Sequence, residues 1–163
     1  MNIIFLDIDG VLTSARTGWM NWDIYATTFL KWCCENSNTK IVISSTWRCN
    51  RNREFFADIF QEHLHEDWMT GVRLNCRGNE IQTWLDIHPE VLNYVIIDDD
   101  SDMLPHQLEN LILTNTYNGL MFEDMEKLRE KLNLIMTPCN MNLQTIIQHP
   151  NMFSQSKLYG TQL

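Results

Sequence analysis

The sequence predicts an α/β fold in which helices cover both faces of a parallel sheet. Two observations support this fold class: short apolar runs alternate along the chain with amphipathic segments, and the runs are continuously apolar. Continuous apolar strands are typical of a parallel sheet that is buried on both faces. With 163 residues, 44% of them hydrophobic, the chain suits one domain with a single core.

Four short runs have the composition of buried strands. Aliphatic and β-branched residues dominate them, and such side chains fit the pleated surface of a sheet. The predicted strands are residues 2–7, 40–45, 94–97 and 111–113.

The first predicted helix lies between the first two strands. Asp23 is a suitable N-cap residue, because its carboxylate can accept hydrogen bonds from free backbone N–H groups of the first turn. Apolar residues then recur near the i, i+4, i+7, i+8 spacing of one helix face. We expect this apolar face to consist of Tyr25, Phe29, Trp32 and Cys33.

Three further segments have apolar residues at helical spacing. The first follows the second strand, and a less regular connector, residues 65–78, separates it from the next, which ends near Pro89. The last helix follows a turn at Gly119. The expected apolar faces are Phe56, Ile59, Phe60, His63 and Leu64; Ile81, Trp84 and Leu85; and Phe122, Met125, Leu128 and Leu132, with the last set pointing inward.

The composition changes after the last predicted helix. Residues 134–163 are rich in Asn and Gln and contain Pro138 and Pro150. We therefore divide the chain into a domain of residues 1–133 and a C-terminal extension of residues 134–163. Two interpretations of the extension are open: a loosely packed or disordered segment, or a segment that shades the site or packs on a neighbouring subunit of an oligomer.

Charge and cysteine content bound the class of protein. A net charge of −9 argues against tight, salt-driven binding along a long nucleic acid, but it is compatible with a small phosphorylated substrate. Five cysteines without disulfide-like spacing indicate a reducing cytoplasm. The N-terminal apolar run is too short for a signal peptide or a membrane span. We therefore expect a soluble cytoplasmic protein that does not enter membranes.

Two carboxylates follow the first predicted strand. Asp7 and Asp9 are separated by one residue, so on an extended strand both side chains project to the same side. Crowded carboxylates repel each other unless a cation or a shared proton compensates the charge. Gly10 lets the backbone leave the strand through angles that other residues avoid. The arrangement suits a hard divalent cation, with one carboxylate free to attack phosphorus.

Other predicted strands end in polar residues as well. Ser44 and Ser45 end the second strand, and Asp98 and Asp99 follow the third. In folds with a parallel sheet, ligands bind at the carboxyl ends of the strands. Three separate segments therefore place polar side chains where this architecture binds a ligand.

These motifs resemble those of the haloacid dehalogenase (HAD) superfamily, whose members are mostly phosphatases with a Rossmann-like fold. The resemblance is closest to compact HAD domains associated with RNA-repair proteins, and the phosphatase domain of polynucleotide kinase-phosphatases is a more distant relative. It covers roughly residues 2–133 and is carried by residues 7–12 (DIDGVL), 41–44 (IVIS), 44–48 (SSTWR), 77–81 (RGNEI) and 96–99 (IIDD).

The resemblance implies a role for each motif. Asp7 is the nucleophile, and Asp9 protonates the leaving oxygen and later accepts a proton from the attacking water. Asp7, the main-chain carbonyl of Asp9 and the pair Asp98 and Asp99 hold one Mg²⁺ ion. Ser44 and a basic residue of the third motif bind the remaining phosphoryl oxygens.

Two assignments are open at this point. The metal ligands among Asp98, Asp99 and Asp102 are undecided, because both adjacent acids and an Asp-x-x-x-Asp spacing occur in the superfamily. For the basic residue we favour Arg77, just before a predicted helix, over Arg73.

Arginines are concentrated between the second and third motifs. A guanidinium group can bind a phosphate through two parallel hydrogen bonds, so this concentration indicates a substrate with more than one phosphate or a nucleotide end. The alternative for Arg51 and Arg53 is a solvated basic helix start. We expect phosphate binding by Ser44, Ser45, Arg48 and Arg77.

The segments between the motifs are too short for a large cap domain, so we expect an open site that admits extended substrates. In the irregular stretch of residues 10–22, Trp19 and Trp22 either stack on a base or pack beside the first helix. We predict a Mg²⁺-dependent phosphomonoesterase for a nucleotide or a nucleic-acid terminal phosphate. The alternatives are a phosphatase for a sugar phosphate or another small metabolite, and a HAD-fold binding module without turnover.

Overall fold

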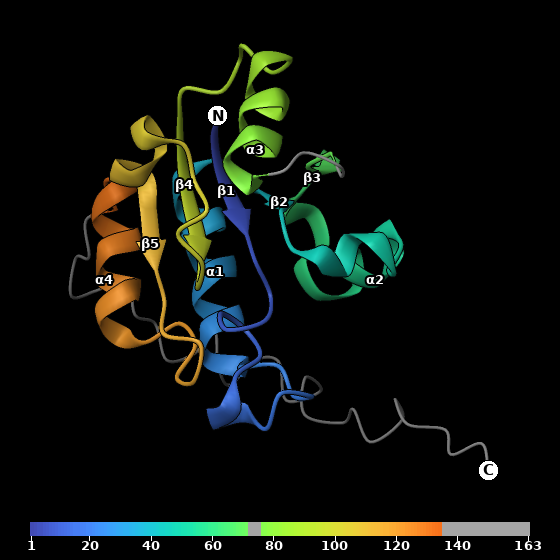
Figure 1. The fold of residues 1–163 in the computed structure, drawn as a ribbon, viewed down its shortest axis with the longest axis vertical. Coiled ribbons are helices and arrows are strands. Elements are labelled where there is room, and N and C mark those ends of the chain that lie inside the picture. The colour runs from blue at the N-terminus through green and yellow to red at the C-terminus, as the bar shows by residue number, and fades with distance from the viewer. Residues whose placement is uncertain (72–75, 135–163) are drawn as a thin grey trace.

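The computed structural model describes residues 1–71 and 76–134. Within them, five parallel strands form one sheet in the order β3-β2-β1-β4-β5 (Figure 1), which confirms the predicted α/β fold with a parallel sheet. The strands are β1 (Asn2–Leu6), β2 (Thr39–Ile43), β3 (Leu64–Met69), β4 (Asn93–Asp98) and β5 (Leu111–Leu113).

The order in which the strands are added reverses at β1. From β1 the chain moves outward to β2 and β3, and it then returns to place β4 on the other side of β1. At such a reversal a crevice opens outside the carboxyl ends of the strands. The register aligns the end of β1 with Ile43 of β2 and Ile97 of β4. The next residues are Asp7, Ser44 and Asp98, and all three therefore lie at one edge of the sheet.

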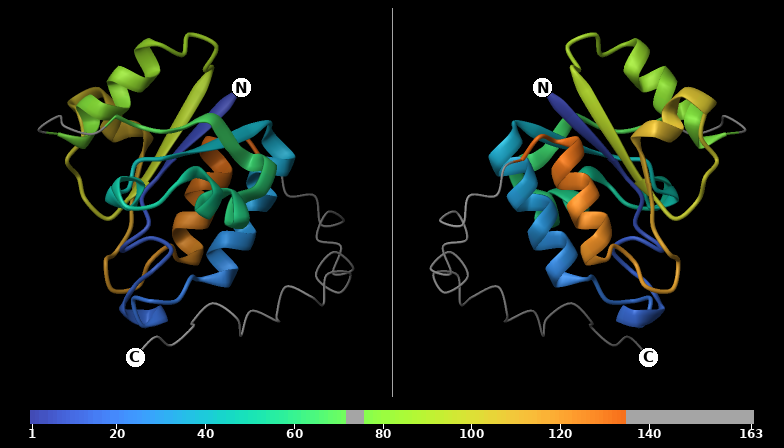
Figure 2. Two further views of the ribbon diagram at one scale, coloured as in Figure 1. Left: turned by 90° about the vertical axis from the view of Figure 1, so that its right-hand side faces the viewer. Right: turned by 90° about the vertical axis from the view of Figure 1, so that its left-hand side faces the viewer.

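Helices cover both faces of the sheet, as predicted (Figure 2). Side chains of β1 point alternately to the two faces: Leu6 packs in the cluster with α1, α2 and α4, whereas Phe5 packs with α3. The ring of Phe5 meets Trp84 edge-on, with centroids 5.4 Å apart. The helices are α1 (Ile24–Ser37), α2 (Arg53–Phe60), α3 (Arg77–Asp86) and α4 (Phe122–Lys131).

The connections between strands leave the carboxyl edge open. Between β1 and β2 the chain forms α1 and one 3₁₀ turn, and between β2 and β3 it forms α2 and two 3₁₀ turns. The described residues therefore include no large cap domain. In the same part of the chain, no helix combines the length and apolarity needed to span a membrane. The extension from residue 135 onward lies outside the described residues, so the division of the chain at residue 134 stays a prediction.

The predicted irregular connector at residues 65–78 is wrong in its first part, because β3 forms there. His65, Glu66 and Asp67 interrupt the apolar pattern of this strand, so it lacks the continuous apolar run by which the other strands were found. Its position at the sheet edge tolerates polar residues on the solvent side. The preceding helix also ends earlier than expected, at Phe60, and His63 lies in a 3₁₀ turn before β3.

Two predicted helix faces are wrong at one residue each. Tyr25 in α1 is 83% exposed and Phe122 in α4 is 72% exposed. In α1 the buried stripe begins one residue later than predicted, at Ala26, and continues through Leu30 and Cys33. Phe122 is the first residue of α4, and the buried residues of this helix begin later, at Asp124.

Acidic side chains accept hydrogen bonds from backbone N–H groups at the N-termini of α1 and α4, two helices that lie side by side in Figure 2. Asp23 accepts hydrogen bonds from the N–H groups of Tyr25 and Ala26, as predicted for an N-cap. At α4 the N-cap position holds Met121, which has no capping oxygen. Instead, Asp124 Oδ2 accepts a hydrogen bond from the N–H of Met121 at 3.2 Å, which satisfies one backbone donor at this helix start.

Candidate functional site

Three carboxylates converge at the carboxyl edge of the sheet. Asp7 follows β1, and Asp98 and Asp99 lie at the end of the adjacent β4. One oxygen from each of the three carboxylates lies within 4.8 Å of the others. Asp7 and Asp98 are buried, with 5% and 1% exposure, whereas Asp99 is partly exposed. We refer to these three residues and Arg77 as the carboxyl-edge cluster.

Gly10 allows the loop after β1 to pass directly over Asp99. Its φ is +74°, in the left-handed region, and a Cβ atom at this position would overlap the Asp99 carboxylate. The glycine is therefore required for two independent reasons. Thr114, after β5, donates a hydrogen bond of 2.8 Å to the carbonyl of Gly10, so the loop after β1 is also connected to the end of β5.

Arg77 provides the positive charge of the cluster. It is the first residue of α3, and its Nη1 lies 2.8 Å from Asp7 Oδ1 and 3.1 Å from Asp98 Oδ2. The same nitrogen donates a hydrogen bond of 3.0 Å to the carbonyl of Ser44. The guanidinium thus connects the ends of β1, β2 and β4. Arg73, the alternative basic residue, lies outside the described residues.

Burial and mutual repulsion shift the proton affinity of the two buried acids. Desolvation, followed by the charge of Asp7, raises the pKa of Asp98 to about 7, although Arg77 partly opposes the shift. Desolvation also raises the pKa of Asp7, again against the effect of Arg77. Burial alone lowers the pKa of Arg77, but Asp7 and Asp98 outweigh it and the net shift is upward. The cluster therefore favours additional positive charge.

The donor set of the cluster fits a hard divalent cation. It consists of carboxylate oxygens, the ligands that Mg²⁺ prefers. The buried Oδ2 of Asp98 accepts no hydrogen bond, and Arg77 is its charged neighbour at 3.1 Å. Asp102, which was open as a metal ligand, does not belong to this group of oxygens. Its Oδ2 accepts a hydrogen bond from the N–H of Arg77 at 3.1 Å, a role at the start of α3.

Asp9 is exposed, and two side chains orient its carboxylate. Thr13 Oγ1 donates to Oδ1 at 2.7 Å, and Trp47 Nε1 donates to Oδ2 at 2.8 Å. The side chain of Asp9 does not belong to the group formed by Asp7, Asp98 and Asp99. Sequence reasoning gave Trp47 no individual role. Its position three residues after Ser44, in a loop that leaves the carboxyl edge, was the sequence feature that could have indicated a place near the site.

The two serines at the end of β2 are buried but differ in their hydrogen bonds. The Ser44 hydroxyl has no hydrogen-bond partner, although Ser44 is completely buried. Ser45 Oγ accepts a hydrogen bond from the N–H of Trp47 at 3.4 Å. A buried hydroxyl without a partner costs free energy, so Ser44 has a donor available for an oxygen of a bound phosphate.

The geometry of Arg48 differs from the expectation that it binds phosphate. Its side chain is buried, and Nε donates to the carbonyl of Thr70 at 3.1 Å. Nη2 donates to the carbonyl of Gly71 at 3.0 Å and to Glu80 Oε2 at 2.5 Å, while Nη1 donates to the carbonyl of Ser44. With four of five N–H donors engaged, Arg48 joins the loop after β2 to α3. Its role in phosphate binding stays a prediction, for which the four engaged donors leave one N–H group.

Of the two tryptophans in the stretch of residues 10–22, Trp22 packs. Its ring meets Trp47 edge-on, with centroids 5.6 Å apart, and Phe60 at 6.4 Å. Trp19 is 42% exposed and has a φ of 60°. For Trp22 the structure thus favours packing over base stacking.

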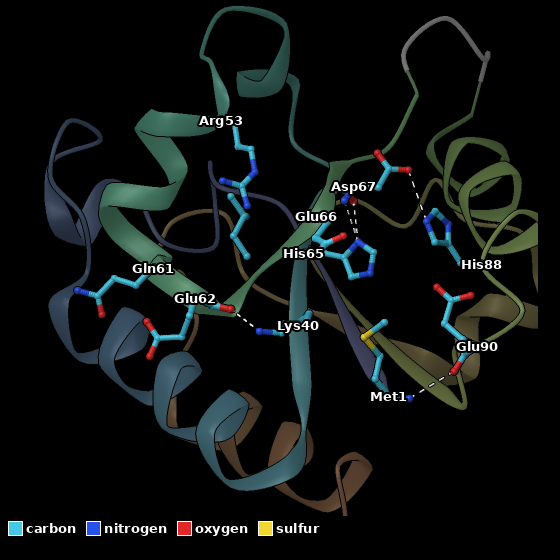
Figure 3. Close-up of a pocket in the computed structure, with 11 residues that line it drawn as sticks. Met1, Lys40, Arg53, Gln61, Glu62, His65, Glu66, Asp67, His88 and Glu90 are labelled. Atoms are coloured by element: carbon cyan, nitrogen blue, oxygen red, sulfur yellow. Dashed lines mark hydrogen bonds and ion pairs between the residues drawn. The ribbon is translucent and has the colours of Figure 1, made fainter.

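A hollow borders β3, and we call it the β3 pocket (Figure 3). Its volume is about 650 Å³, and it borders the start of β2 and β3 and the N-terminus. His65 and His88 point toward each other there, with ring centroids 5.4 Å apart. Among the described residues, the carboxyl-edge acids are the group whose ligand atoms lie close enough for a metal ion, and the β3 pocket contributes none of them.

Comparison with protein families gives a match that includes every motif residue of the site. The family model of the HAD domain in Swiss Army Knife RNA repair proteins matches residues 3–125, well over half of the chain, and this confirms the expected resemblance. No curated protein and no solved structure matches. The chain therefore belongs to the family of HAD domains found in Swiss Army Knife RNA repair proteins.

Proposed function

We propose that this domain is a Mg²⁺-dependent phosphomonoester hydrolase that acts on the terminal phosphate of a nucleotide or nucleic acid. Its family supports a phosphatase-like hydrolase in general. The observation that carries the proposal is the carboxyl-edge cluster, in which Asp7 lies beside two further carboxylates and Arg77. HAD-family domains generally use Mg²⁺, and the three carboxylates are suitable ligands for this ion.

The proposed reaction has two steps. A carboxylate oxygen of Asp7 attacks phosphorus while the bond from phosphorus to the leaving oxygen breaks, which gives an aspartyl phosphate at Asp7. Asp9 supplies the proton for the leaving oxygen. In the second step a water molecule attacks the phosphorus of this aspartyl phosphate and gives a proton to Asp9. The bond to Asp7 then breaks, and inorganic phosphate leaves.

The remaining groups of the site stabilise charge on the phosphoryl oxygens. A bound Mg²⁺ ion, held by Asp7, Asp98, Asp99 and the main-chain carbonyl of Asp9, would neutralise part of that charge. Arg77 and the unpartnered hydroxyl of Ser44, the residue after β2, would donate hydrogen bonds to the phosphoryl oxygens. Phosphoryl transfer depends mainly on such positioning and electrostatic stabilisation.

Two observations support the proposed substrate class. Within the described residues no cap domain encloses the carboxyl edge, and an open edge accommodates the end of a longer molecule. The family name refers to RNA repair, a process in which phosphates at broken ends are substrates. These two observations favour a nucleic-acid end over a free sugar phosphate.

The test is a panel of phosphate esters assayed with and without Mg²⁺. We expect Mg²⁺-dependent release of phosphate, with a higher kcat/KM for phosphorylated oligonucleotides than for mononucleotides or sugar phosphates. Asp7→Asn should abolish turnover. Equal, poor rates on all three classes would contradict the substrate class, and hydrolysis of none of them would favour a HAD-fold binding module.

A further inference from the structure

A small hollow adjoins Asp9, and its lining includes none of the residues of the carboxyl-edge cluster. Its volume is about 270 Å³, and Asp9, Thr46, Trp47, Asn50 and Arg51 line it. In the proposed reaction Asp9 protonates the leaving oxygen. A substrate group bound in this hollow would therefore lie beside that oxygen, in the part of the substrate beyond the scissile phosphate. We call these five residues the leaving-group hollow.

Arg51 brings a positive charge without a carboxylate partner to this hollow. Four other described arginines, Arg16, Arg48, Arg77 and Arg129, each pair with an acidic side chain, whereas Arg51 forms no ion pair with any described residue. Its guanidinium lies 5.3 Å from the ring centroid of Phe55 and 5.7 Å from that of Trp47. Nη1 donates a hydrogen bond of 3.1 Å to the carbonyl of Asn50. Stacking on the two rings orients the cation, and its remaining N–H groups form no hydrogen bond with the described residues.

The surroundings of Trp47 argue against base stacking in the hollow. Arg51 lies over its ring, Trp22 meets it edge-on at 5.6 Å, and its N–H is donated to Asp9. Phe55 packs beside it as well, with centroids 6.1 Å apart. The ring is thus occupied by protein contacts, and the accessible recognition groups of the hollow are the guanidinium of Arg51 and polar side chains.

We propose that Arg51 binds the phosphodiester next to the terminal phosphate, so that the hollow selects a nucleotide chain over an isolated monophosphate. This inference rests on the proposed function. The terminal phosphate has its own cation in Arg77, so a second cation in the leaving-group hollow matches a second phosphate. Recognition through backbone charge rather than a base predicts little dependence on base sequence.

The test compares substrates that differ only in the charge of this linkage. One is a dinucleotide with a terminal phosphate at its 5′ or 3′ end, whichever of the two phosphates the protein removes faster. The other is the same dinucleotide with a neutral methylphosphonate in place of its phosphodiester. A charge-assisted hydrogen bond at an exposed site corresponds to a preference of about tenfold in kcat/KM for the charged linkage. We expect Arg51→Gln to reduce this ratio to about one.

Arg53→Gln is the matched control. Arg53 lies two residues away, and its side chain lines the β3 pocket instead (Figure 3), so this variant should keep the ratio of the unmodified protein. An unmodified protein without preference for the charged linkage would overturn the inference, as would a preference that persists in Arg51→Gln.

Failure of the proposed function is a separate outcome. If the protein hydrolyses no phosphate ester with Mg²⁺, the two dinucleotides are compared by their dissociation constants, measured by calorimetry. Tighter binding of the charged linkage that depends on Arg51 but not on Arg53 would still support the inference. Equal dissociation constants for both dinucleotides would overturn it.

Discussion

The carboxyl-edge cluster and the β3 pocket differ in that the larger hollow is not the one with the candidate catalytic groups. The β3 pocket is the larger hollow, but the candidate metal ligands lie in the cluster. The β3 pocket has more than twice the volume of the leaving-group hollow, about 650 Å³ against about 270 Å³. Two of its positively charged groups, however, bind nearby backbone carbonyls. Lys40 donates to the carbonyl of Glu62, and the N-terminal amine donates to the carbonyl of Glu90. At the carboxyl edge, in contrast, burial and mutual repulsion raise the pKa values of Asp7 and Asp98, and Asp98 Oδ2 accepts no hydrogen bond.

The topology of the sheet explains this difference. Parallel strands bring their carboxyl ends to one edge, and the reversal at β1 leaves that edge uncovered between β1 and β4. Asp7, Ser44 and Asp98 reach the edge through the register of three central strands. The β3 pocket borders the edge strand, where neighbouring loops supply polar partners.

The largest expected effect is the loss of the proposed nucleophile. Asp7→Asn keeps the size of the side chain but removes the negative charge that attacks phosphorus. We expect kcat to fall by at least about 10⁴-fold, the order found when a central residue of covalent catalysis is removed. Phosphate release at saturating Mg²⁺ measures the effect, and circular dichroism checks the fold.

Glu66→Gln in the β3 pocket is the matched control for this substitution, because it also replaces a carboxylate by its amide, here an exposed one away from the cluster. Its kcat should stay close to that of the unmodified protein. A large loss in Glu66→Gln, or substantial turnover in Asp7→Asn, would reverse the assignment of the two regions.

The second effect concerns the cation of the cluster. Arg77→Ala removes the group that contacts Asp7 and Asp98, and we expect kcat to fall by about 10²–10³-fold, as for other donors that stabilise a transition state. Arg77→Lys should recover part of this loss, because it keeps the charge but not the fork of N–H groups.

Arg129→Ala is the control for the loss of a paired arginine. Arg129 forms an ion pair with Glu126 within α4, away from the cluster, so kcat should not change. Near-normal turnover in Arg77→Ala would transfer the role of the basic residue to Arg73.

The third effect tests how Asp9 is held. Trp47→Phe keeps an aromatic ring against Trp22 but removes the N–H that Trp47 donates to Asp9. We expect kcat for nucleotide substrates to fall by about tenfold, the equivalent of one hydrogen bond to a charged group. The loss should be smaller for p-nitrophenyl phosphate, since its leaving oxygen needs little protonation. Equal losses for both substrates would show that Trp47 acts through packing alone.

The sequence predicted those parts of the site that depend on local pattern and register. The three central strands are continuous apolar runs, and the acids and serines that follow them therefore reach one edge. The β3 strand was not predicted, because His65, Glu66 and Asp67 interrupt its apolar pattern. The expected face of α1 was displaced by one residue, because periodicity alone did not distinguish Tyr25 from Ala26 as the start of the buried stripe.

Contacts made by returning loops were beyond sequence reasoning. The loop after β2 turns back over the edge, which brings Trp47 to Asp9 and turns Arg48 inward to Glu80. Both side chains belong to the same short motif, yet Trp47 contacts Asp9, whereas Arg48 binds Glu80 of α3. Their directions depend on the packing of α3 and Trp22 against this loop, and no local pattern encodes that packing.

The smallest expected effect is a pH-dependent stabilisation by Mg²⁺. The raised pKa of Asp98, about 7 against an ordinary 3.8, means that the folded protein keeps a proton that the unfolded chain releases. Between these pH values Asp98 therefore makes the metal-free fold less stable as pH rises. Since Mg²⁺ binds the ionised carboxylate, the rise in Tm with Mg²⁺ should be about 2–5 °C larger at pH 8 than at pH 5.

Differential scanning fluorimetry at both pH values measures this difference. Asp98→Asn, which cannot ionise, should lose most of the pH dependence, whereas Glu66→Gln in the β3 pocket should retain it. An equal rise in Tm at pH 5 and pH 8 would mean that Mg²⁺ does not compete with the proton of Asp98. Stabilisation that disappears in Glu66→Gln would instead locate the ion in the β3 pocket and separate metal binding from the carboxyl edge.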